Sequence, residues 1–369
     1  MDARIVAAAE SPYLRHPPPG TTTERVLADA LLRALAAAGI ERSSIDGLGV
    51  SSFTLAPDRV AELAWRLGIR ASWLMDDGTG GASGINMLQH AVRAVEAGDA
   101  RTIVLLAGDH FDRASFQQLL DSFNRATEEY LTPIPVGGPN ALFAQLTTRH
   151  MAAHGLERAD YGRLVVAQRA WAGTNPGAVY REPMTLRDYL DAPIVAPPLG
   201  RFDCVPVVSG ADALVVTAAA TGVAVRAVRG LHNHDGQEGD GLQTGLAEVA
   251  ERLWAEAGFG PSDIDAAYIY DDYPAMVLIQ LDDLGLVPGG DVAAYLRSEL
   301  PPINTSGGQL SAGQAGAAGG MHGLVEATQQ LLGRARDRTI GARRAVVSGY
   351  GIVAYRYGVC ANAAVLEAM

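Results

Sequence analysis

Tyrosines and carboxylates at two points of the chain offer acid–base chemistry. Tyr270 begins a Tyr-Asp-Asp-Tyr run that includes Asp271 and Asp272, and Tyr350 lies in a Ser-Gly-Tyr-Gly segment. A phenol can donate or accept a proton, and it can stabilise an enolate once water is excluded. Taken alone, a tyrosine at a strand end is more often an ordinary half-buried residue. The elements around these residues must therefore decide their role.

Other reactive residue types occur in weaker patterns. Ser83 lies at a glycine-rich helix start with no identifiable base nearby, and a serine there is usually a cap. His232 and His234 lie in the polar segment GLHNHDGQEGDG, which is more typical of a solvated loop than of a metal site. The two cysteines, Cys204 and Cys360, have neither CxxC nor Cys/His spacing. We therefore expect no metal site and no disulfide framework.

The elements that position these residues form an internal repeat. The segment from Glu24, ERVLADALLRALAAAGIERSSIDGLGV, predicts a helix, a glycine stop and a short strand, and residues 246–270, LAEVAERLWAEAGFGPSDIDAAYIY, predict the same. Gly39 and Asp46 match Gly258 and Asp265 at one constant offset. In each half a glycine-rich loop, a long helix and a buried strand then follow, from Gly80 and from Gly307. The sequence thus predicts two similar α/β halves.

Residues 111–204 interrupt this repeat. They contain two predicted amphipathic helices, Asn140–His154 and Arg158–Ala172, and proline-rich loops, which favours an inserted loop or lid domain over a site. The predicted organisation is a first half of residues 1–110 with 205–220, the insertion 111–204, and a second half of residues 221–369.

Composition excludes several classes of function. The 369 residues are 48% hydrophobic and carry a formal net charge of -12, so a nucleic-acid-binding surface is not expected. No stretch reaches the roughly 20 apolar residues of a membrane helix, and the first residues lack the apolar core and cleavage site of a signal peptide. We expect a cytoplasmic protein that does not enter a membrane.

The motifs GGASGINMLQHAVRAV, NPGAVYREPMTLRDYL, FDCVPVVSGADALVV, IYDDYPA and NTSGGQLSAGQAGAAGG run along most of the chain. In this order they resemble the thiolase superfamily, and within it the branch of the sterol carrier protein x thiolase and the bacterial lipid-transfer-like proteins. The resemblance implies a five-layer αβαβα fold with two five-stranded sheets, whose central helices begin near Ser83 and Gly319. It also implies a homodimer that pairs through strands near residues 101–108.

The resemblance also implies that the acyl-transfer groups of thiolases are absent. Gly81 stands at the position of the nucleophilic cysteine, and Gln314 replaces the histidine of the Gly-His-Pro run. Val347 stands where the acid/base cysteine of a Cys-x-Gly motif belongs. Glutamine can hydrogen-bond a thioester carbonyl but cannot shuttle a proton.

By the same resemblance, Tyr270 replaces the Asn or His that begins a further family motif, an Asn-Glu-Ala-Phe or His-Asp-Cys-Phe run at the end of a strand. Tyr350 lies close to the position of the lost Cys-x-Gly motif. The expected function is therefore retro-aldol cleavage of a bulky, possibly steroid-like β-hydroxyacyl-CoA, with these two tyrosines and Asp271 as catalytic groups. The expected substrate-binding residues are Gly81, Ser83, His232, Asn304, Gly307, Gly308 and Gln314. Coenzyme A enters as part of the substrate, and no separate cofactor is expected.

Two other functions remain open at this point. The chain could be a non-catalytic acyl-CoA- or lipid-binding subunit of a hetero-oligomer, or an acyltransferase that has moved its nucleophile. Members of this branch often work with a small zinc-ribbon and OB-fold partner. The absence of an obvious basic cluster for the CoA phosphates in the sequence is compatible with such a partner.

Overall fold

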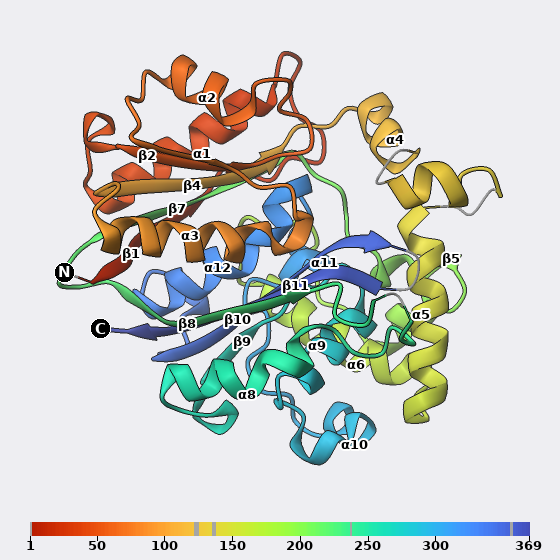
Figure 1. Ribbon diagram of the computed structural model, residues 1–369. Coiled ribbons are helices and arrows are strands. Elements are labelled where there is room, and N and C mark those ends of the chain that lie inside the picture. The colour runs from red at the N-terminus through yellow and green to blue at the C-terminus, as the bar shows by residue number, and fades with distance from the viewer. Residues whose placement is uncertain (1, 122–124, 135–137, 237, 355–356) are drawn as a thin grey trace.

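Five layers of helix and sheet alternate in the computed structural model of the chain (Figure 1). The structure describes residues 2–121, 125–134, 138–236, 238–354 and 357–369. From top to bottom in Figure 1, an outer helix layer, a sheet, a central helix pair, a second sheet and a second outer helix layer follow one another. The predicted thiolase-type α/β fold is confirmed by this arrangement.

The first sheet has five strands in the order β3-β2-β4-β7-β1. Its outer face is covered by α1 (Thr23–Ala38) and α2 (Arg59–Leu67). Strand β7 runs antiparallel to both neighbours, whereas β2 is parallel to β3 and β4. The strands are β1 (Ala3–Glu10), β2 (Gly47–Ser51), β3 (Trp73–Asp76), β4 (Thr102–Asp109) and β7 (Gly210–Ala218).

The second sheet has four strands, in the order β8-β11-β10-β9, where five were predicted. The segment that would supply the fifth contributes only one parallel bridge, from Ile303 to Ala267. It is preceded by Pro301 and Pro302, which have no N–H to donate to a ladder. The strands are β8 (Val223–His232), β9 (Ala266–Tyr268), β10 (Arg344–Ala354) and β11 (Tyr357–Ala368), and the outer helices are α8 (Leu246–Ala257) and α9 (Pro274–Asp283).

The central layer consists of α3 (Ser83–Ala97) and α12 (Gly319–Leu331), which begin where the sequence predicts. Their backbones meet at Gly84, where an added Cβ would lie 2.1 Å from the carbonyl oxygen of Gly320. Only glycine permits this approach. The two sheets join edge to edge over only two residue pairs, Arg4–Ala224 and Ile5–Val223, so each half keeps its own sheet.

The repeat seen in the sequence has the same structure in both halves. Helices α1 and α8 each end at a left-handed glycine, Gly39 with φ 67° and Gly258 with φ 83°. The carboxylate of Asp46 then accepts hydrogen bonds from backbone amides at the start of β4, and that of Asp265 does so at the start of β10.

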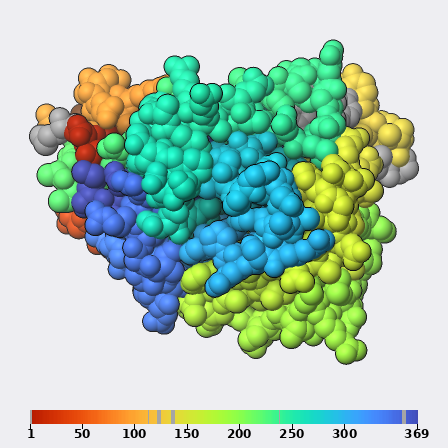
Figure 2. Space-filling model, turned by 90° about the horizontal axis from the view of Figure 1, so that it is seen from below, coloured from red at the N-terminus to blue at the C-terminus, as the bar shows by residue number. Residues whose placement is uncertain are grey.

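The insertion packs beside the second half. Figure 2 shows its yellow and green residues directly against the blue residues of α10 (Val292–Arg297), and α6 contacts that helix. Its elements are α4 (Arg113–Asp121), η3 (Thr127–Leu131), α5 (Gly138–His154), α6 (Arg158–Ala172), α7 (Leu186–Asp191), β5 (Ile194–Ala196) and β6 (Leu199–Gly200). The second half also contains the short helix α11 (Gly308–Ala312).

The prediction of a dimer interface at the strand near residues 101–108 is wrong. Strand β4 (Thr102–Asp109) is buried along its whole length and pairs with β2 on one side and β7 on the other. The outer edge of this sheet is β3, where Leu74 is 44% exposed. Within the described residues, no helix is long and apolar enough to cross a membrane.

Candidate active site

A cavity of about 520 Å³ opens between the insertion and the ends of the second-half strands. Its polar wall contains Tyr270, Asp272, Gln314 and Tyr350, and Gly81 lies beside them. The rest of the wall is largely apolar. It includes Phe53, Phe111, Phe116, Leu119, Leu120, Phe143, Cys204, Met276 and Val353.

Tyr270 lies two residues beyond the end of β9, and both its backbone and its hydroxyl are hydrogen-bonded there. Its carbonyl oxygen accepts a hydrogen bond from Gln280 Nε2 at 2.9 Å. The hydroxyl donates to Asp272 Oδ2 at 3.0 Å and accepts from Gln314 Nε2 at 3.2 Å. Gln314 also donates to the other oxygen of Asp272. The phenol thus has one fixed acceptor and one fixed donor within the cavity.

Burial sets the protonation of this pair. It raises the pKa of the Asp272 carboxyl to about 7, chiefly because the charged form loses its hydration. Burial, and next the nearby Asp272 charge, raise the pKa of the Tyr270 phenol well above its ordinary value. Near neutral pH the carboxyl is therefore poised to take a proton, while the phenol keeps its own.

Tyr350 lies on β10 and lines the same cavity. Its hydroxyl accepts a hydrogen bond from the backbone N–H of Gly358, and its ring contacts that of Phe143 edge-on at 6.3 Å. Two residues later, Ile352 has a left-handed backbone with φ 54°, which a β-branched residue rarely adopts. Such strain gathers at functional sites.

Known proteins resemble this chain in sequence and in fold. The family described as "Thiolase C-terminal domain-like" matches residues 227–361. The "17-hydroxy-3-oxo-4-pregnene-20-carboxyl-CoA lyase" of Mycobacterium tuberculosis is 31% identical over 367 residues, 90% of this chain and 93% of that protein. The chain belongs to the thiolase superfamily. Its relatives place it in the predicted branch, among the side-chain-cleaving aldolases.

Two further relatives agree. The "Steroid side-chain-cleaving aldolase" of Thermomonospora curvata is 30% identical over 350 residues, 85% of this chain and 86% of that protein. The solved structure "Ltp2-ChsH2(DUF35) aldolase" superposes with a TM-score of 0.83 at 26% identity and covers 100% of this chain and 98% of that one.

At Gly81, the position at which the sequence predicts that the thiolase nucleophile is missing, there is no room for a side chain. A Cβ added to Gly81 would lie 2.3 Å from ring atoms of Tyr270 and 2.2 Å from the carbonyl oxygen of Tyr350. Real Cβ atoms do not approach other atoms so closely. With the Tyr270 ring in this place, a cysteine side chain at position 81 cannot fit.

Asp271, which the sequence predicts to be catalytic, does not line the cavity. Its carboxylate accepts hydrogen bonds from Gln168 Nε2 and from the backbone amides of Gln309 and Leu310. It thereby anchors the first turn of α11. The neighbouring Asp272 is the carboxylate in the cavity, because successive residues after a strand point in different directions.

Three residues expected to contact substrate form the layer behind the cavity. Asn304 pairs both its side-chain atoms with the backbone of Ile269. Gly307 and Gly308 have positive φ, and an added Cβ would meet Ala172 in the first case and the Asp271 carboxylate in the second. These glycines allow close packing of the protein on itself, and they do not line the cavity.

Two other expected substrate contacts lie elsewhere. Ser83 is fully buried at the first turn of α3, with its hydroxyl 3.4 Å from that of Thr79. His232 is exposed at the end of β8, opposite Cys360 in the sheet. Gly81 and Gln314 are thus the predicted binding residues that line the cavity.

The cysteines are poor nucleophiles. Cys204 lines the cavity, but burial, with the charges of Asp203 and Asp272, raises the pKa of its thiol to about 12. Burial raises the pKa of the Cys360 thiol to about 11. Both stay protonated at neutral pH, and a thiol reacts as its thiolate.

A basic cluster that the sequence did not reveal surrounds two aromatic rings. The guanidinium of Arg169 lies 4.9 Å from the ring centre of Tyr180 and 5.1 Å from that of Phe202. Arg15 lies over the Tyr180 ring, and Arg201 lies near both rings. None of the three arginines forms an ion pair with a described carboxylate. They come from distant segments, so no local pattern marked them.

Proposed function

We propose that this protein cleaves a carbon–carbon bond of a bulky β-hydroxyacyl-CoA by a retro-aldol reaction. The observation that carries the proposal is the shared cavity of Tyr270, Asp272 and Tyr350 at a site where a thiolase nucleophile cannot fit. Two relatives of this protein are named as a steroid side-chain-cleaving aldolase and as a 17-hydroxy-3-oxo-4-pregnene-20-carboxyl-CoA lyase.

In the proposed reaction, the substrate β-hydroxyl gives its proton to the Tyr270 oxygen as that phenol passes its own proton to Asp272. The bond between the α- and β-carbons breaks, and its electrons form the enolate of the thioester while the β-carbon becomes a carbonyl. Tyr350 then protonates the α-carbon and regains a proton from solvent, while Asp272 releases its proton to solvent. No covalent acyl-enzyme is needed.

The cavity supports a large, mostly apolar acyl group. Its volume of about 520 Å³ and its aromatic and aliphatic walls suit a fused-ring skeleton better than a short chain. For the other end of the substrate, we assign the CoA phosphates to the arginine cluster. Arg201 and Phe202 closely precede the cavity residue Cys204, and Arg169 donates to Ser311, three residues before Gln314.

We further propose a homodimer and a small partner subunit with zinc-ribbon and OB-fold parts. The similar solved structure is named as an aldolase together with a DUF35 protein, which supports a partner for this chain. The cytoplasm is the proposed compartment, because both described cysteines are free.

The two alternative functions have less support. An acyltransferase would need a thiolate, which neither Cys204 nor Cys360 provides at neutral pH. A non-catalytic binding subunit would have no use for a hydrogen-bonded tyrosine and a carboxyl with a near-neutral pKa in its cavity.

Replacing each tyrosine by phenylalanine tests the mechanism. Tyr270→Phe and Tyr350→Phe should each lower kcat for cleavage of a β-hydroxyacyl-CoA by about 10²-fold or more, while thioester binding changes little. Products are quantified by chromatography, with and without a candidate DUF35-type partner.

Tyr295→Phe is the matched control. Its hydroxyl is buried, lies outside the cavity and has no hydrogen-bond partner among the described residues, so wild-type cleavage is expected. Wild-type rates in both cavity variants would contradict the proposed mechanism, and the binding-subunit alternative would then take its place.

A further inference from the structure

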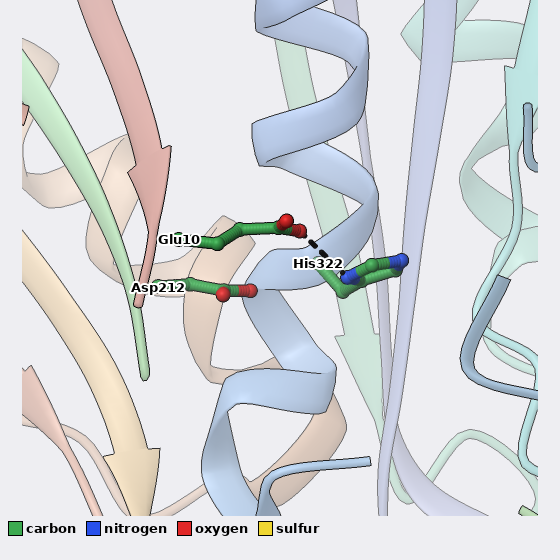
Figure 3. A group of neighbouring side chains, drawn as sticks. All are labelled: Glu10, Asp212 and His322. Atoms are coloured by element: carbon green, nitrogen blue, oxygen red, sulfur yellow. Dashed lines mark ion pairs between the residues drawn. The ribbon is translucent and has the colours of Figure 1, made fainter. Parts of the chain in front are cut away.

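Two carboxylates and an imidazole converge in the interior, away from the cavity (Figure 3). Glu10 ends β1, Asp212 lies directly opposite it on β7, and His322 projects from α12. One ligand atom from each side chain lies within 4.8 Å of those of the other two. This triad, Glu10–Asp212–His322, belongs to no part of the proposed reaction.

We infer that the triad binds one divalent transition-metal ion, of the Zn²⁺ or Mn²⁺ class. The first reason is charge. Glu10 and Asp212 are cross-strand neighbours, and two like charges in that position repel each other. Without an ion, burial and the Glu10 charge raise the pKa of Asp212 well above its usual range, so that this carboxyl keeps a proton. A divalent ion could displace that proton and balance the charges of both carboxylates.

The second reason is an unused ligand atom. Asp212 is fully buried, and its Oδ2 has no hydrogen-bond donor among the residues that the structure describes. Both carboxylates point toward the His322 ring in Figure 3. A buried carboxylate oxygen without a donor is costly unless a cation occupies the space before it.

The third reason is geometry. Glu10 Oε1 and His322 Nδ1 are 3.1 Å apart. Ligand atoms that share one ion at about 2.0–2.2 Å lie roughly 3–3.5 Å from each other. One imidazole nitrogen with two carboxylate oxygens suits zinc or manganese, and leaves room for water as a further ligand.

The surrounding residues hold the ligands in place. Ser306 Oγ lies 2.7 Å from His322 Nε2, which leaves Nδ1 to face the carboxylates. The Tyr13 hydroxyl donates to Asp212 Oδ1 at 2.9 Å and lies 3.3 Å from Nδ1. Outer hydrogen bonds of this kind are typical of metal sites.

The ion would join the two halves of the molecule. Glu10 and Asp212 belong to the first sheet, while His322 lies on the central helix of the second half. None of the three lines the cavity, so the ion has a structural role and does not touch the reacting bond.

Metal binding by the full chain tests the inference. After treatment with a chelator and dialysis, the protein is titrated with Zn²⁺ alone and with Mn²⁺ alone, and bound metal is counted by mass spectrometry. We expect one ion per chain and a higher Tm with metal. Co²⁺ in the same site should give visible absorption bands that report the coordination number and geometry of the bound ion.

Asp212→Asn keeps the shape of the side chain and should weaken binding at least 100-fold, and Ser306→Ala about 10–100-fold. Glu10→Gln, whose side chain is 24% exposed, is the second ligand variant if Asp212→Asn does not fold. Asp283→Asn is the control, because that carboxylate is held by Thr244 outside the triad and should leave binding unchanged.

Failure of the natural chain to retain any ion would overturn the inference. So would equal binding by the natural chain, Asp212→Asn and Glu10→Gln. In either case the triad is a His322–Glu10 ion pair beside a protonated Asp212. Neither outcome bears on the proposed lyase activity, which is measured separately.

Discussion

At the scale of single residues, the Tyr270–Asp272 hydrogen bond decides what the cavity can do. A phenol alone is a weak base, but a phenol bonded to a carboxylate can pass its proton on as it accepts another. The sequence showed both aspartates without showing which one points into the cavity. That choice depends on α11, whose backbone amides bind Asp271 and leave Asp272 to the phenol.

The pKa of Asp272 predicts the pH dependence of cleavage. Because the base acts in its charged form, kcat/KM should rise with pH up to about 7 and level off above it. Asp272→Asn should lower kcat/KM by about 10²-fold and remove this rise. A pH profile that keeps its inflection near 7 in the variant would assign the base to another residue.

The same carboxyl should lower stability at high pH. Its pKa is raised in the folded state, so the folded protein binds more protons than the unfolded chain between about pH 4 and 7, and stability falls as pH rises through that window. Asp272→Asn should therefore be more stable than the natural chain at pH 8, by about 2 kcal/mol, and no more stable at pH 4. Urea unfolding at both pH values measures this difference.

At the scale of elements, the loop before α3 no longer has room for the chemistry of its family. Gly81→Cys should not restore thiolysis, and overpacking against Tyr270 should destabilise the protein by about 1–3 kcal/mol or more. Thermal unfolding and a thiolysis assay test both statements. A stable variant with thiolase activity would show that the Tyr270 ring moves aside without cost.

The arginine cluster is built from three separate segments of the chain. Substitution of its arginines tests the proposed contact with the CoA phosphates. Arg15→Ala and Arg201→Ala should each raise KM for the CoA thioester by about 5- to 20-fold with little change in kcat, since the proposed contact is with a part of the substrate far from the reacting bond. The same acyl group on a short pantetheine thioester should show no such change. An equal rise in KM with both substrates would show that the arginines support the fold and do not bind the CoA phosphates.

Elements with strong local signals were predictable from sequence. The helices that start at Ser83 and Gly319, and the paired glycine stops at Gly39 and Gly258, follow from periodicity and glycine chemistry. The absence of a fifth strand in the second sheet was harder to predict from the sequence. Its segment still forms one bridge to β9 at Ile303, and only Pro301 and Pro302, which have no N–H to donate, prevent a longer pairing. Asn304, Gly307 and Gly308 have the residue types of a ligand turn, and only their tertiary contacts reveal that they pack against protein.

At the scale of the whole molecule, the free edge of the first sheet is where a second copy can pair. Strand β3 has one neighbour among the described strands, and Leu74 on it and Trp65 on the adjacent α2 are exposed. An exposed, partly apolar edge is a template for pairing. Leu74→Lys should shift the proposed homodimer to monomer in sedimentation at micromolar concentration, with Tm of the monomer unit little changed. A natural chain that sediments as a monomer would remove the proposal.

The narrow seam between β1 and β8 has a consequence for how the protein opens. Only two residue pairs cross this seam, so the strands of each half are hydrogen-bonded almost entirely to strands of the same half. We therefore expect the two halves to differ in amide hydrogen exchange. The cavity lies where these units and the insertion meet. Partial opening under mild denaturant should therefore expose the amide of Tyr270, which donates to the Ser348 side chain, while β4 and the β10–β11 ladder remain protected. Inactivation should then precede the loss of either sheet.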